Sequence, residues 1–99
     1  MDMSHGFIPQ ALDAALSALD ALAAGEGVRH DDLIAGAIAI EMLAAQAAQP
    51  HHRRTGMDAA VRGLRILATR ESVSGSHHGR RAAVSFAAIV RDVRRVFIH

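Results

Sequence analysis

Apolar residues recur three or four positions apart along most of the chain, which is the spacing of one face of a helix. Between these segments stand residues that favour turns: Gly25 and Gly27, Pro50, and a Ser- and Gly-rich stretch at 72–79. No segment alternates apolar and polar residues with the period of two that a strand needs. The sequence therefore predicts an all-α protein with helices at about 8–24, 31–48, 56–71 and 80–98.

Each predicted helix end has a local signal. Pro9 suits the first turn of the first helix, and Gly25 suits a C-terminal cap. Thr55 and Asp58 resemble a capping box at the start of the third helix. The faces expected to be buried are Leu12, Ala15, Leu16, Leu19, Leu22 and Ala23 in the first helix, Met57, Ala60, Val61, Leu64, Leu67 and Ala68 in the third, and Ala82, Phe86, Ile89, Val90, Val93, Val96 and Phe97 in the fourth.

The connections between the predicted helices are short. Connections of this length usually join antiparallel neighbours. A chain of 99 residues has room for one small core. We therefore expect a single domain over 1–99, an antiparallel arrangement resembling a four-helix bundle.

The second predicted helix differs from the others, because Glu41 is the only charged residue between Leu33 and Ala45. Such a helix is expected at the centre of the fold, packed on several faces, or at a subunit interface. Ala35, Gly36 and Ala39 would let another helix approach closely, either within the fold or across a dimer seam. A homodimer is our expectation. The apolar run is shorter than the roughly 20 residues that span a membrane, so no membrane partner is expected.

Charge is strongly segregated along the chain. Residues 1–50 hold seven acidic residues against Arg29 alone, a formal balance of −6, whereas residues 51–99 hold ten arginines against three acidic residues, a balance of +7. Every basic residue is Arg, which fits either a GC-rich coding sequence or selection for a forked donor that grips phosphate or carboxylate. Glu41 is expected to pair with an arginine, because an unmatched charge in an apolar helix is costly.

Two similar His- and Arg-rich segments stand just before the third and fourth predicted helices. Free amides at a helix N-terminus favour anions, and arginines strengthen that preference. An up-and-down order would place the two segments at opposite ends of the protein, and solvated loops are the alternative interpretation. The candidate residues for binding an anion or a partner are these segments, His51, His52, Arg53, Arg54, His77, His78, Arg80 and Arg81, together with the basic helix faces, Arg62, Arg65, Arg91, Arg94 and Arg95.

The basic helix faces resemble an electrostatic footprint for nucleic acid. No aromatic residue is interleaved among these arginines to stack on bases, so sequence-specific recognition is not expected. Pairing of the same arginines with the acidic first half is the other interpretation.

One pair of residues resembles an enzyme motif. Arg70 and His77 are separated by six residues, and the pair is similar to the Arg-x(4-6)-His signature of the HEPN superfamily of four-helix ribonucleases. The resemblance implies a dimer in which Arg70 and His77 act on RNA phosphodiesters. Glu71 stands where the family often has Asn or Asp.

Other chemistry is poorly supported. The chain has no cysteine, which excludes disulfides and cysteine-based zinc sites. Adjacent histidines point apart and the flanking arginines repel cations, so we expect neither metal nor cofactor. The first residues lack the basic region of a signal peptide, so the expected location is cytoplasmic.

No nucleophile–base pair or phosphate-binding loop is evident. The sequence therefore favours a small interaction protein that regulates or inhibits a protein partner and is not itself an enzyme. A non-specific nucleic-acid binder and the HEPN-like ribonuclease are the alternatives.

Overall fold

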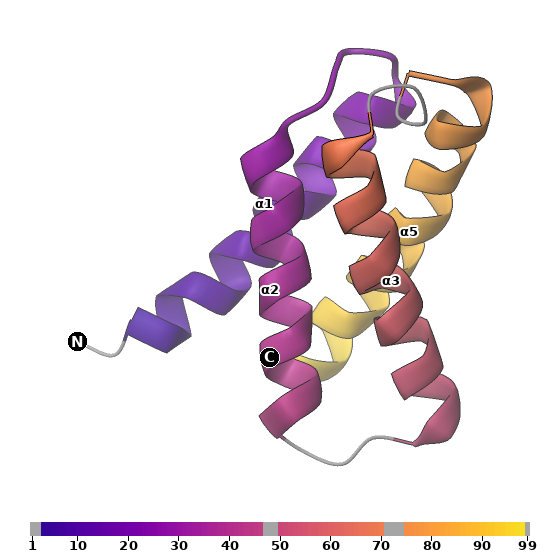
Figure 1. Cartoon of the computed structure of the whole chain (residues 1–99). Coiled ribbons are helices and arrows are strands. Elements are labelled where there is room, and N and C mark those ends of the chain that lie inside the picture. Colours follow the sequence, from indigo (N-terminus) through magenta and orange to yellow (C-terminus); the bar gives the residue numbers. More distant parts are fainter. Residues whose placement is uncertain (1–2, 47–49, 71–74, 99) are drawn as a thin grey trace.

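The computed structural model describes residues 3–46, 50–70 and 75–98 of the chain. They form four helices, α1 (Met3–Ala23), α2 (His30–Gln46), α3 (His51–Thr69) and α5 (His77–Phe97), and no strand occurs among them. The chain reverses direction between successive helices (Figure 1). The predicted all-α, antiparallel architecture is confirmed.

The helices are arranged in two layers. α2 and α3 lie side by side in one layer, and α1 and α5 form a second antiparallel pair behind them (Figure 1). The molecule measures 36 × 32 × 20 Å, and a helix is about 10 Å across, so it is two helices thick. The core therefore lies between the two layers.

Helix α2 is not the enclosed central helix that was one of the two expectations from its composition. Its core face is fully covered, but Ile38 is 40% exposed and Glu41 is also exposed. In a two-layer fold each helix keeps one side in water, whatever its hydropathy. The buried positions of α2 are Leu33, Gly36, Ala37, Ala39, Ile40 and Leu43.

Small residues bring the helices close together within the fold. A Cβ atom on Gly36 of α2 would fall closer than 3.0 Å to the Cβ of Ala15 in α1, a separation that real Cβ atoms essentially never show. A Cβ on Gly63 of α3 would collide with the ring of Phe86 in α5 in the same way. The small residue Gly36, considered above for a dimer seam, is therefore used for packing inside one chain.

The predicted buried face is correct for α3, apart from the half-buried Val61, and is rotated on α5. The buried side chains of α5 are Ala83, Ala87, Val90 and Val93, while Phe86 and Ile89 are only half-buried. Helix α5 packs against both α1 and α3, so small residues face the core directly and the larger ones lie to one side. Periodicity alone could not distinguish these neighbouring positions.

Three of the four predicted helix starts are wrong by several residues. Helix α1 begins at Met3, not near residue 8, and Pro9 lies inside it. Helix α3 begins at His51, not 56, directly after Pro50, whose φ of −54° suits the start of a helix. Thr55 is therefore not a cap, and its hydroxyl donates to the carbonyl of His51 (2.9 Å).

Helix α5 begins at His77, not 80, because Ser76 caps it: the Ser76 hydroxyl accepts a hydrogen bond from the amide of Gly79 (3.0 Å). The predicted cap at Gly25 is confirmed by its φ of +78°. Helix α3 ends at Thr69, two residues before its predicted end near residue 71, and Arg70 follows in an extended conformation. The end predicted near residue 48 lies outside the described residues.

Candidate docking groove

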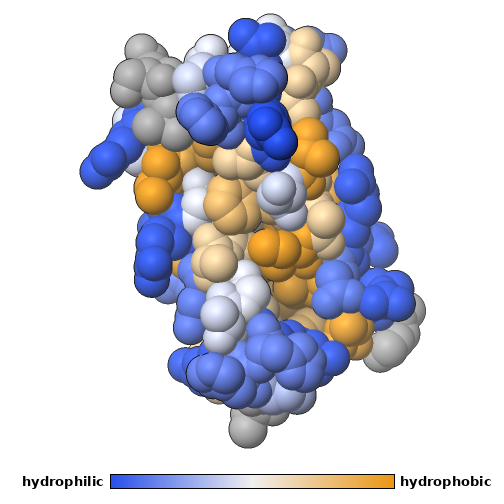
Figure 2. Space-filling model, turned by 90° about the vertical axis from the view of Figure 1, so that its right-hand side faces the viewer, coloured by the Kyte–Doolittle hydropathy of each residue, from blue (hydrophilic) through white to orange (hydrophobic). Residues whose placement is uncertain are grey.

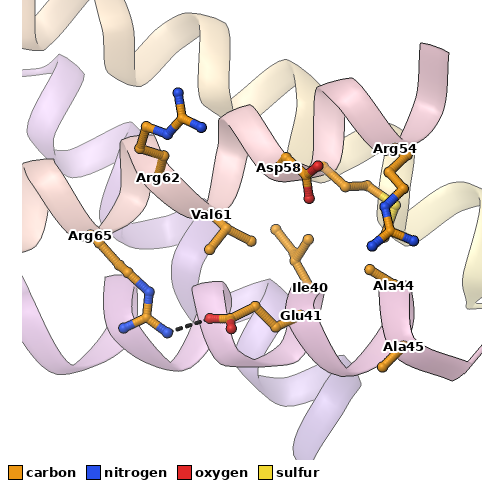
Figure 3. A pocket seen from close by; sticks show the side chains of 10 residues that line it. Ile40, Glu41, Ala44, Ala45, Arg54, Asp58, Val61, Arg62 and Arg65 are labelled. Atoms are coloured by element: carbon orange, nitrogen blue, oxygen red, sulfur yellow. Dashed lines mark hydrogen bonds and ion pairs between the residues drawn. The ribbon is translucent and has the colours of Figure 1, made fainter. Parts of the chain in front are cut away.

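A groove of about 550 Å³ runs between α2 and α3 on the outer side of their layer (Figure 3). Its floor is apolar. Ile40 and Met57 are buried beneath it, and Val61 and Ala44 are half-buried at its sides. Since Ile40 is fully buried and Met57 is only 1% exposed, the apolar surface that the groove offers to a ligand is that of Val61, Ala44 and Ala45. The remaining lining residues are Glu41, Ala45, Arg54, Asp58, Arg62 and Arg65.

The rim of the groove is charged. Arg54, Asp58, Arg62 and Arg65 follow one another at intervals of four, four and three residues, which places them on one side of α3. Arg65 reaches across the groove and forms an ion pair with Glu41 of α2 (Figure 3). The predicted pairing of Glu41 is confirmed. Both side chains are about half exposed, at 46% for Arg65 and 50% for Glu41, so the pair adds at most about 1 kcal/mol to stability.

Two rim arginines differ from Arg65 in their pairing. Among the described residues, neither Arg54 nor Arg62 forms an ion pair. The guanidinium of Arg54 extends beside Ala44 at one end of the groove, whereas Arg62 points away from the floor (Figure 3). The groove therefore combines an apolar floor with one guanidinium at its edge and one on its outer rim, both available to a carboxylate.

The arginines near the end of α5 are already paired with carboxylates. Arg91 donates to Asp20 (3.1 Å) and Arg94 to Asp13 (2.5 Å), and these two pairs tie α5 to α1. The hydrogen bond from Arg94 to Asp13, with the attraction between their charges, raises the pKa of Arg94. Arg95 pairs with Asp92 on the same helix. Pairing with the acidic first half, one of the two interpretations of the basic faces, is confirmed for Arg65, Arg91 and Arg94.

The two His- and Arg-rich segments are not loops. His51, His52, Arg53 and Arg54 form the first turn of α3, and the segment from His77 begins α5. The two helix starts lie at opposite ends of the molecule (Figure 1), as an up-and-down order requires. The histidines of both segments, together with Arg80 and Arg81, are exposed. One chain therefore does not combine them into a single site.

The residues of the ribonuclease resemblance flank the connection between α3 and α5. Arg70 follows α3 in an extended conformation, His77 is the first residue of α5, and both are exposed. Elsewhere, no three His or acidic side chains of the described residues gather closely enough to hold a metal ion. Within the same residues, no helix has the length and hydropathy needed to cross a bilayer.

Three lining residues of the groove, Arg54, Arg62 and Arg65, are among the candidates predicted from the sequence, but the groove itself is not. Arg54, Asp58 and Arg62 are spaced four residues apart, and this spacing indicates a row of charges on one face of a helix. The floor cannot be inferred from sequence, because it depends on which sides of α2 and α3 meet. No family model matches the chain, and neither a curated protein nor a solved structure matches it.

Proposed function

We propose that this protein is a helical interaction module that regulates or inhibits a larger protein by binding an acidic, amphipathic segment of it in the groove between α2 and α3. We also propose that the protein is cytoplasmic and forms a homodimer. The observation that carries it is the groove, with its apolar floor and with Arg54 and Arg62 on its rim, neither of which forms an ion pair within the described part of the chain. An amphipathic helix laid into an apolar groove is a common mode of peptide recognition.

The charges at the groove favour a protein segment over a nucleic acid. Asp58 and Glu41 stand among the three arginines, so a continuous row of phosphates would meet carboxylates. A peptide can place one carboxylate near Arg54 and apolar side chains over Val61 and Ala44. The apolar contacts would contribute to the affinity, and the carboxylate would fix the orientation.

A binding experiment with designed peptides tests this proposal. Two helical peptides with the same apolar face would be compared by NMR, one with Glu and one with Lys on the polar face. The Glu peptide is expected to bind more tightly and to shift the amide signals of Ala44, Ala45 and Val61. Arg54→Glu should weaken this binding about tenfold or more. Arg70→Glu, which also reverses an exposed arginine but lies outside the groove, is the matched control.

Equal binding of both peptides, or shifts confined to other surfaces, would contradict the groove assignment.

Nucleic-acid binding is the second candidate, and it is favoured by the exposed Arg70, Arg80 and Arg81, which form no ion pair among the described residues. Binding of poly-dT with a steep salt dependence would support it. RNA cleavage that is lost on His77→Ala would instead support the ribonuclease.

A further inference from the structure

Helix α5 has an exposed face whose middle is uncharged. No charged residue occurs between Arg81 and Arg91, and in this interval Val84 is 60% exposed and Ser85 and Ala88 are also exposed. On the side of the molecule formed by α3 and α5, apolar and small residues cross the middle, with hydrophilic residues above and below (Figure 2).

Six of the exposed residues of α5 follow a heptad spacing, and the exposed Val84 lies beside this row. They occur alternately three and four residues apart, which is the spacing of a helix face that packs along another helix. The two central residues are small and would let a second helix axis approach to about 8 Å. The row consists of His78, Arg81, Ser85, Ala88, Asp92 and Arg95, all of them exposed.

This row is complementary to itself. Its centre lies midway between Ser85 and Ala88, and reversing the row about that point exchanges Arg81 with Asp92. Among the described residues Arg81 has no ion pair, and Asp92 is paired only with Arg95 of its own helix (2.5 Å). In an antiparallel pair related by a two-fold axis, each Arg81 would therefore face Asp92 of the other copy.

We propose that two copies of this chain associate through α5, antiparallel, with Ser85 of one copy opposite Ala88 of the other and Arg81 opposite Asp92. A two-fold interface repeats each contact, so the arrangement makes two intermolecular ion pairs. His78 then faces Arg95 of the second copy, where a neutral imidazole can accept a hydrogen bond from the guanidinium. The proposal places the expected homodimer on α5, and no residue of the row belongs to the groove.

The area along the row indicates a weak dimer. The 21 residues of α5 extend over about 30 Å, and a helix about 10 Å across offers about 300 Å² along one face. A stable interface takes about 600–1,000 Å² from each partner. We therefore expect self-association that is weak and detectable only at high protein concentration.

Sedimentation of charge-reversed variants tests both the association and its register. Arg81→Glu alone places two carboxylates opposite each other, and Asp92→Arg alone places two guanidinium groups opposite each other. Each variant should weaken self-association at least about tenfold. A mixture of the two restores both opposite-charge pairs, so fluorescently labelled Arg81→Glu should form a heterodimer with unlabelled Asp92→Arg. The double variant should self-associate like the wild type.

Ile38→Glu is the matched control, because Ile38 is an exposed apolar residue of α2 and lies outside the row. It should leave self-association unchanged, and circular dichroism should show that every variant remains folded. A wild type that stays monomeric at about 100 µM would overturn the proposal. So would a dimer that resists both single reversals or dissociates on Ile38→Glu. None of these outcomes bears on peptide binding in the groove. A monomeric wild type would remove the homodimer from the proposed function and leave the peptide-binding part untouched.

Discussion

The ring of Phe86 in α5 lies directly against the backbone of Gly63 in α3, where a side chain of any size would collide with it. Gly63→Ala should therefore lower the free energy of unfolding. The collision costs about 1–3 kcal/mol, which exceeds the roughly 1 kcal/mol gained by replacing glycine within a helix. Urea denaturation would measure the difference.

Gly56→Ala is the control for this experiment. Gly56 lies two turns earlier on α3, and an added Cβ there would meet nothing within 4 Å. The substitution should raise the free energy of unfolding by about 0.5–1 kcal/mol, because alanine restricts the unfolded chain. If both substitutions stabilised the protein, the Phe86 ring could not lie directly against Gly63.

Because Gly36 and Ala15 are in contact, substitutions at these two positions should have coupled effects on stability. Gly36→Ala should destabilise the protein because two Cβ atoms would collide where α1 crosses α2. Combining it with Ala15→Gly removes the collision, so the double variant should be more stable than the sum of the two single changes by about 1 kcal/mol or more. Additive effects in thermal denaturation would show that the helices are further apart.

Removing the hydroxyl group of Ser76 and removing that of Thr55 should have different effects on stability. Ser76→Ala should cost about 1 kcal/mol of stability, because the amide of Gly79 loses its hydrogen-bond acceptor. Thr55→Ala should cost little, because Thr55 lies within α3 and only bonds back to the carbonyl of His51. A larger loss at Thr55 in chemical denaturation would indicate that α3 starts later, at the capping box the sequence suggested.

The ion pairs between α1 and α5 should be weak and sensitive to salt. Asp13→Asn and Asp20→Asn together remove the carboxylate partners of Arg94 and Arg91, all of which are substantially exposed. We expect the melting temperature to fall slightly at low ionic strength, and the difference from the wild type to vanish at about 1 M salt. A large loss of stability that persists in high salt would show that these pairs are structural.

The helices themselves could be predicted from the sequence because their signals are local. The repeat of apolar residues located all four helices, and Gly25 marked the end of α1. The starts of α3 and α5 were misplaced because His51 and His77 were interpreted as loop residues, although Pro50 and Ser76 before them are suitable helix starts. Local polarity does not prevent a helix from extending when its outer side faces water.

The groove and the face of α5 could not be predicted, because they depend on how the helices meet. Arg54 and Arg62 were identified as candidates, but nothing in their own segment shows that Ile40 and Ala44 of α2 lie beside them. Val84 and Ala88 lie outside the buried face that the sequence predicted for this helix, and both are exposed as that prediction implies. Which other side chains lie beside them on the surface could not be predicted, because that depends on the packing of α5 against α1 and α3.

Because the fold is only two helices thick, its helices depend on one another for stability. Each helix covers part of the core shared by its two neighbours, and no third layer lies beneath to remain folded when one helix detaches. Loss of α5 alone would expose the inner faces of both α1 and α3. All four helices should therefore melt in one cooperative transition, and a fragment lacking any of them would not retain a native structure.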